Sequence, residues 1–127
     1  MYISWHGNNY FKIQNSQHSI VLNPYSLDKN FKYGKAKGDV AIFTDPQGVG
    51  VSKLDEEAMV ITSAGEYETK DIFVYGRQTN GHLIYLIIFE DVRIAFLGEY
   101  GHQVLTDKDL ELVSGADLER VFQYGRV

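Results

Sequence analysis

The residues that could do chemistry in this sequence are few and scattered. It has four histidines, and no two of them show a local metal-binding spacing such as H-x-H or H-x-x-x-H. His18 and His82 are expected to be surface residues, whereas His6 and His102 each stand beside a glycine where a strand is expected to end. The absence of cysteine excludes disulfides, thiolate metal ligands and thiol nucleophiles.

Carboxylates near glycine turns are the other candidates. Asp45, Glu66 and Glu99 lie in such turns, and any two of them could in principle pair for acid–base catalysis. Glu66 is equally compatible with an ordinary hairpin residue. The sequence has no G-x-S-x-G elbow and no phosphate-binding G-x-x-x-x-G-K-[ST] loop, and "GVG" at 48–50 is too short for a dinucleotide fingerprint.

The stretch "DVAIFTDPQGVGVSK", residues 39–53, could position such side chains. It begins as a buried strand and then turns into a loop at residues 44–50. Strands that end in short, conformationally special loops often carry catalytic residues. Pro46 and the two glycines at 48 and 50 predict a tight turn here.

The elements that surround this loop are mostly strands, because β-branched and aromatic residues alternate with polar ones. Polar turns, including "FED" and "ETKD", predict hairpins. Thr106 as N-cap and Gly115 as stop predict one short helix between them, and a second is expected from Ala116 or Asp117 to about Tyr124. "SKLDEEAM" could form one helical turn. The strands are expected at Tyr2–Trp5, Tyr10–Gln14, Ser19–Leu22, Val40–Phe43, Met59–Thr62, Tyr67–Thr69, Ile72–Gly76, His82–Glu90 and Val92–Leu97.

Composition limits the partners and the cellular location that we expect for the chain. A net charge of −5 disfavours nucleic acid and anionic membranes as partners, since both reward clustered basic residues. The lysines at 29, 32, 35 and 37 are interpreted as a solvated loop. The N-terminus lacks the pattern of a signal peptide, and charges interrupt the longest apolar run before it could span a bilayer. We therefore expect one soluble, cytoplasmic, mostly β domain over residues 1–127.

Several segments, taken in order, resemble the UlaG-like metal-dependent hydrolases of the metallo-β-lactamase superfamily. "ISWHGNNYFKIQ" is similar to the family's opening strand pair, and "SIVLNPYS" and "KGDVAIFT" to the strands that follow. "MVITSAGEYETKDIFVYG" and "IYLIIFEDVRIAFLGEYGH" resemble the family's later hairpins. The resemblance implies an αββα sandwich of two similar halves. This chain would cover its first sheet and the beginning of the second half, a truncated half-sandwich with mixed and antiparallel strands.

The family's metal motif, S/T-H-x-H-x-D-H, falls on the loop at 44–50. Thr44 matches its first position, but Asp45 and Gln47 stand at the first two histidines. Val49 stands at the aspartate and Gly50 at the last histidine. A metal site needs about three or four protein ligands. These vestigial positions offer only Asp45, so we expect no metal and no other cofactor.

The resemblance also points to positions outside this loop that could hold a metal ligand. Asn8 replaces a histidine near the site, and the family's last histidine comes from a C-terminal segment beyond the point where this sequence stops. Glu99 stands where the family has an aspartate, and Gly101 and His102 match the G-H that follows. Asp45, Glu99, His6 and His102 are thus the residual ligand candidates.

Two functions are favoured over a third possibility, an unrelated small β-barrel with a binding function. The favoured hypothesis is a non-catalytic protein that serves in binding, assembly or regulation, with no catalytic residues. The alternative is a residual hydrolase that uses zinc or manganese, with an altered ligand set or one completed by a second subunit. A half-sandwich would leave a sheet face or edge open, so we expect a homo-oligomer, and a dimer in particular.

Overall fold

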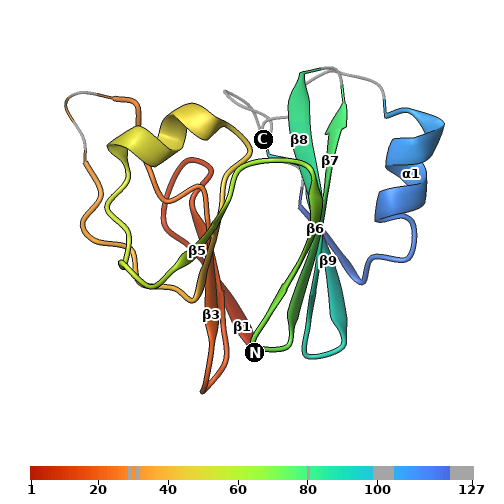
Figure 1. Cartoon of the computed structure of the whole chain (residues 1–127), viewed down its shortest axis with the longest axis horizontal. Coiled ribbons are helices and arrows are strands. Elements are labelled where there is room, and N and C mark those ends of the chain that lie inside the picture. Colours follow the sequence, from red (N-terminus) through yellow and green to blue (C-terminus); the bar gives the residue numbers. More distant parts are fainter. Residues whose placement is uncertain (29, 31, 80, 99–104, 121–127) are drawn as a thin grey trace. The chain divides into compact units, whose positions relative to one another are not determined.

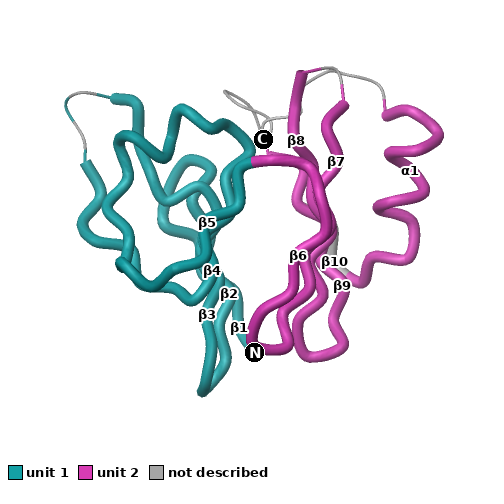
Figure 2. The backbone as a smooth tube through the Cα atoms, in the orientation of Figure 1, with its two compact units in different colours: residues 1–62 teal, residues 63–127 magenta. Residues whose placement is uncertain are grey.

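The computed structural model describes residues 1–28, 30, 32–79, 81–98 and 105–120. It divides into two compact units, residues 1–62 and 63–127 (Figure 2). Each unit contains one five-stranded sheet. The expected class, mostly β with mixed and antiparallel pairing and a short helix near the C-terminus, is confirmed.

The first unit contains a mixed sheet in the order β1-β2-β3-β4-β5. Its strands are β1 (Tyr2–Trp5), β2 (Phe11–Gln14), β3 (Ser19–Leu22), β4 (Val40–Ile42) and β5 (Met59–Ile61). The pairs β1–β2 and β2–β3 are antiparallel, whereas β3–β4 and β4–β5 are parallel. Strands β1, β3, β4 and β5 therefore point the same way. Their C-terminal ends share one edge of the sheet, called here the carboxyl edge.

Two long connections, residues 23–39 and 43–58, cover one face of this sheet. Beneath them lies a buried cluster made of Tyr10, Val21, Ala36, Ala41 and Phe43, against which Tyr25, Tyr33, Val49 and Leu54 pack. The connections are tied together where Ala36 forms a parallel bridge with Leu54 and its amide donates to the Lys53 carbonyl at 2.7 Å. All three residues of β4 are fully buried, as expected for a central parallel strand.

The second unit contains a sheet in the order β10-β9-β8-β7-β6. Its strands are β6 (Gly65–Thr69), β7 (Ile72–Thr79), β8 (His82–Phe89), β9 (Val92–Phe96) and β10 (Leu118–Arg120). All neighbours are antiparallel except β10, which is parallel to β9. The expected hairpins are confirmed. Lys70–Asp71 and Glu90–Asp91 form their turns with positive φ at both residues, which matches the right-handed twist of the strands.

Helix α1 (Asp107–Val113) lies against one face of the second sheet (Figure 1). Val113 packs with the buried side chains of Ile84, Ala95 and Leu97. The helix begins at the expected N-cap, Thr106. Within the described residues, no helix has the length and apolar character needed to cross a bilayer.

Two expected helical segments are wrong. Residues 118–120, expected in a second helix, form β10 instead, because Asp117 exchanges hydrogen bonds with Arg93 and starts parallel pairing along β9. The rest of that segment lies outside the described residues. "SKLDEEAM" forms a turn in which the Ala58 amide donates to the Asp55 carbonyl at 3.2 Å, since Leu54 is already paired with Ala36.

Candidate functional site

The carboxyl edge of the first sheet is the natural place for a site, because ligands of open sheets with parallel strands collect at the C-terminal strand ends. Four connections leave the sheet there, and three of them stay in the first unit. His6 follows β1, Asn23 follows β3, and the loop that begins at Thr44 follows β4. The last of these carries the family's metal motif.

Asn23 fixes the start of that loop. Its side chain is buried, its Nδ2 donates to Thr44 Oγ1, and its Oδ1 accepts from the Thr44 amide, both at 2.9 Å. The Asn23 amide also donates to the Ile42 carbonyl at 2.9 Å. The residue has a φ of +49°, a left-handed conformation that asparagine tolerates better than most residues. The ends of β3 and β4 are therefore locked together directly before the motif.

The motif itself folds as a 3₁₀ helix, η1 (Pro46–Val51), and not as the expected tight turn. Asp45 is its N-cap, because one carboxylate oxygen accepts from the Gln47 amide at 3.0 Å. Pro46 occupies the first turn, where a missing N–H costs nothing. A proline after a capping aspartate thus favours a helical start over a turn.

An aromatic ring packs against the middle of η1. A Cβ added at Gly48 would lie 2.2 Å from a ring carbon of Tyr25, so only glycine fits there. The Tyr25 ring in turn stacks on Phe43, with centroids 5.9 Å apart. The loop is therefore held from beneath by apolar packing.

The four vestigial metal positions do not form a ligand set. Asp45 caps η1, and Gln47 is exposed. Val49 packs into the buried cluster of the first sheet, and Gly50 has no side chain and faces open space. Since none of them supplies an imidazole and the one carboxylate is engaged by a backbone amide, this loop does not fit the metal that the fold family implies.

The other residual ligand candidates are only partly placed. His6 is exposed, stacks on Tyr10 with centroids 4.7 Å apart, and lies with its Nε2 3.0 Å from Ser4 Oγ. Glu99 and His102 lie outside the described residues. Glu66 is an exposed residue of β6. Among the described residues, no group of three or more His, Asp or Glu side chains could hold a metal ion.

A cavity that the sequence did not predict lies beside His6. It has a volume of about 340 Å³ and is lined by His6, Tyr10, Lys12, Tyr33, Gly34, Lys35 and Lys37. Only the clustering of lysines in the 29–37 segment points to it, and that pattern alone is equally typical of a solvated loop. The contributions of β2 and of the two tyrosines depend on the fold.

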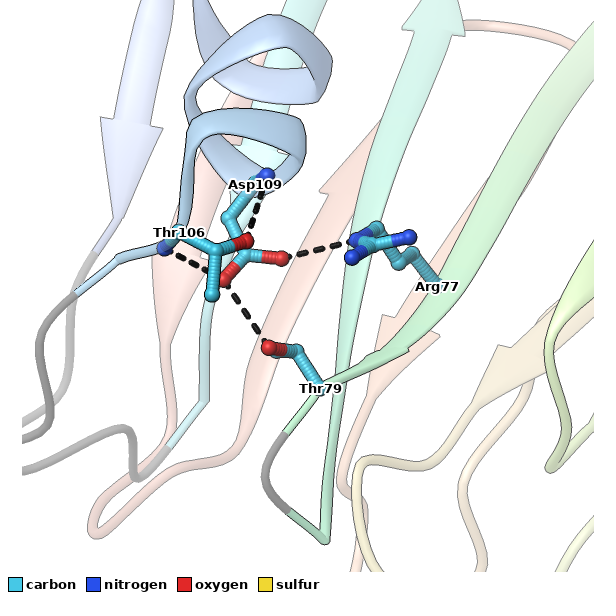
Figure 3. A network of polar contacts seen from close by, with 4 residues as sticks. All are labelled: Arg77, Thr79, Thr106 and Asp109. Atoms are coloured by element: carbon cyan, nitrogen blue, oxygen red, sulfur yellow. Dashed lines mark hydrogen bonds and ion pairs between the residues drawn. The ribbon is translucent and has the colours of Figure 1, made fainter.

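A second unpredicted feature is the buried carboxylate of Asp109 (Figure 3). Arg77 donates from Nε to one of its oxygens at 2.8 Å, while Thr79 Oγ1 and the Thr106 amide donate to the other at 2.9 Å each. Burial alone would raise the pKa of Asp109, but these hydrogen bonds outweigh it and lower the pKa to about 2. Its partners belong to the start of α1 and to β7, so the network is structural.

Comparison with solved structures defines the class of fold. The chain is similar to the crystal structure of a protein from Thermotoga maritima described as a Zn-dependent hydrolase of the metallo-β-lactamase superfamily, with a TM-score of 0.74 and 22% identity. The match covers 92% of this chain and 58% of that one. A protein from Parabacteroides distasonis described as a metal-dependent hydrolase matches more weakly, with a TM-score of 0.49 and 16% identity; the match covers 76% of this chain and 60% of that one. This chain thus has the metallo-β-lactamase fold and spans 58% of the T. maritima chain.

The family follows from the sequence match. The model of the β-lactamase superfamily domain matches residues 2–119. The chain therefore belongs to this family. No curated protein matches it in sequence.

Proposed function

We propose that this protein is a non-catalytic, UlaG-like member of the metallo-β-lactamase superfamily that acts in binding, assembly or regulation. The observation that carries the proposal is the metal loop itself. Its vestigial positions belong to the capped 3₁₀ helix η1, and the single carboxylate, Asp45, is the cap. A side-chain set without imidazole, with its carboxylate engaged by the Gln47 amide, has little to offer a metal.

The chemistry explains why this loss matters. In metal-dependent hydrolysis the metal lowers the pKa of a bound water to make a nucleophile, and protein ligands must hold it with a position left open. Here the contacts Asn23–Thr44 and Tyr25–Gly48 give the loop a stable alternative fold. With its cap intact, Asp45 could offer a metal only its second carboxylate oxygen.

The alternative is a residual hydrolase. It would combine Asp45 and His6 with Glu99 and His102, or complete the site with side chains of a second subunit. His6 and Asp45 do share the carboxyl edge of the first sheet, which is the observation in its favour. It needs zinc or manganese, so metal binding separates the two functions.

The decisive experiment is metal analysis after purification without chelator, followed by zinc and manganese titration by calorimetry. We expect no stoichiometric metal and only weak binding. Tight binding of one equivalent that is lost in Glu99→Ala or His102→Ala would overturn the proposal. Glu111→Ala is the matched control, because Glu111 is an exposed carboxylate on α1.

Self-association is part of this proposal. Strand β1 is an edge strand, and Tyr2 and Trp5 are 62% and 64% exposed on it. Exposed apolar edges favour pairing with a second chain. We expect a homodimer by light scattering, weakened in Trp5→Glu and unchanged in Leu110→Glu, which alters an exposed side chain of α1. A monomer at micromolar concentration would contradict this part. The cytoplasmic location and the lack of nucleic-acid or membrane partners remain predictions.

A further inference from the structure

The cavity beside His6, called here the lysine cavity, combines positive charge with aromatic walls. It lies on the face of the first sheet that the two long connections cover, between β2 and residues 33–37. Its volume of about 340 Å³ is in the range of small-molecule sites, roughly 300–1,000 Å³. All of its lining residues belong to the first unit.

The charge comes from three lysines in a protein whose net charge is −5. Lys35 is partly neutralised, since its Nζ lies 3.4 Å from Asp55 Oδ1 and both groups are well exposed. Among the described residues, no carboxylate forms an ion pair with Lys12 or Lys37. Lys12 and Lys37 come from different elements, both line the cavity, and no carboxylate is among its lining residues, and this favours an anionic ligand.

The aromatic walls are fixed by packing. Tyr10 is almost fully buried and stacks on His6, and it meets the ring of Tyr33 edge-on with centroids 4.9 Å apart. Burial, and next to it the proximity of Tyr33, raises the pKa of Tyr10, so its phenol stays neutral and brings no negative charge into the cavity. Such a set of rings suits stacking against a planar group of a ligand.

Two glycines adjoin the lysine cavity. Gly34 lines it and is exposed, and a Cβ there would meet no atom within 4 Å. Gly7, with a φ of +104°, has no Cβ that would press on the Tyr33 hydroxyl, which lies 2.9 Å from where that atom would be. Ala36 anchors residues 33–37 to the second connection. These contacts hold the backbone of residues 33–37 in place, and a fixed wall lowers the cost of binding.

We propose that the lysine cavity binds a small organic phosphate that carries a planar ring, of the size of a nucleoside monophosphate. The phosphate lies against Lys12 and Lys37, and the ring lies against the aromatic wall of His6, Tyr10 and Tyr33. Inorganic phosphate alone would leave most of the volume empty. This inference deepens the proposed function and rests on it only for the statement that the protein acts by binding.

Calorimetry with four probes tests the ligand class: adenosine monophosphate, ribose 5-phosphate, adenosine and inorganic phosphate. We expect adenosine monophosphate to bind about tenfold or more tightly than each of the others, because only it uses both the lysines and the rings. Its affinity should fall as salt rises. Absence of binding, or equal affinity for inorganic phosphate, would overturn the proposal.

Charge variants locate the phosphate. Lys12→Gln and Lys37→Gln should each weaken adenosine monophosphate binding by about tenfold, as expected for the loss of a charged hydrogen-bond donor. Lys32→Gln is the matched control, because Lys32 lies in the same segment but does not line the cavity. Equal weakening in all three variants would show a diffuse charge effect and contradict the placement of the phosphate at Lys12 and Lys37.

A steric variant tests the cavity without changing charge. Gly34→Leu should weaken binding about tenfold or more, since it adds a bulky side chain at a residue that lines the cavity, while the melting temperature stays near that of the wild type. Gly50→Leu is the control, because Gly50 has equally open surroundings on η1. Unchanged binding in Gly34→Leu would overturn the inference. The zinc titration is a separate measurement. Tight zinc binding would contradict the proposed function without affecting the ligand-binding result at the cavity. Absence of adenosine monophosphate binding would contradict the cavity proposal without affecting the zinc result.

Discussion

Two aspartates of this protein take part in capping short helices, Asp45 as the N-cap of η1 and Asp109 as the third residue of the capping box of α1, and their surroundings differ. Asp45 caps η1 in the first unit with one hydrogen bond to a backbone amide, and its side chain is only partly buried. Asp109 in the second unit is fully buried, and its carboxylate accepts three hydrogen bonds, from Arg77, Thr79 and the Thr106 amide. Its own amide donates to the Thr106 hydroxyl.

The difference concerns what each carboxylate is free to do. A fully buried, fully bonded carboxylate is a structural anchor, because losing any partner leaves a charge without solvation. A partly exposed cap with one bond could in principle be recruited by a ligand at modest cost. The family's metal position thus holds the more available of the two aspartates, but it stands alone there.

The largest effect is expected for Asp109→Ala. Removing the carboxylate leaves the Thr79 hydroxyl and the Thr106 amide without their acceptor and breaks the ion pair with Arg77. Breaking a buried pair costs about 3–5 kcal/mol, and the low end applies here because Arg77 is one-third exposed. Urea unfolding followed by circular dichroism measures the loss. Asp107→Ala is the control in the same turn. An equal loss of stability in both variants would show that the hydrogen bonds of the Asp109 carboxylate add nothing.

Low pH should remove the same contribution gradually. The pKa of Asp109 is lowered from 3.8 to about 2 in the folded protein, so the unfolded chain binds the proton more tightly. The resulting stabilisation, about 2 kcal/mol, is present above roughly pH 4 and is lost as the pH falls toward 2.

The measurement is the free energy of unfolding of wild type and Asp109→Asn between pH 7 and pH 2.5. The gap between the two proteins should narrow over the acidic part of this range. Lys108→Gln, a neighbour on α1, should run parallel to wild type. A gap that stays constant to pH 2.5 would show that Asp109 has no lowered pKa.

Gly48→Ala should destabilise the first unit by about 1–3 kcal/mol, the usual cost of overpacking. Its methyl group would collide with the Tyr25 ring, which cannot retreat because it stacks on Phe43. Thermal unfolding measures the effect. Gly50→Ala, with no atom within 4 Å of its new Cβ, should change little. Similar melting temperatures for both variants would mean that η1 is not packed on Tyr25.

The smallest effect is expected for Asp45→Ala, about 1 kcal/mol for the loss of one N-cap. Asp45→Asn should be close to wild type, since asparagine caps equally well. Both are measured by urea unfolding with and without added zinc. If zinc stabilised the wild type but not Asp45→Asn, Asp45 would be a metal ligand and not only a cap. The contrast with Asp109 would then disappear.

Much of the fold was predictable because its signals are local. The pattern in residues 72–97 predicted β7, β8 and β9, although β7 continues to Thr79, beyond its expected end at Gly76. The polar pairs Lys70–Asp71 and Glu90–Asp91 marked the turns. Thr106 marked the start of α1. The strand β10 was missed because three residues carry too little pattern, and their pairing with β9 depends on contacts between distant parts of the chain.

At the candidate site, the sequence predicted only which metal ligands are missing. The residue types at 45, 47, 49 and 50 are enough to show a degenerate metal motif, because ligand chemistry belongs to the side chains themselves. The sequence did not show that Asp45 would cap a 3₁₀ helix, or that Tyr25 would fill the space at Gly48. Both depend on how the connection after β3 folds over the sheet.

The sequence by itself determined the chemistry that is available: no thiol, no imidazole in the metal loop, and a β-rich chain of the metallo-β-lactamase family. Tertiary structure decided which groups meet. Arg77 and Asp109 are 32 residues apart, and Lys12 and Lys37 come from a strand and a connection that only the fold brings to one cavity. The reason is physical, because burial and pairing depend on neighbours in space, whereas local pattern reports only neighbours along the chain.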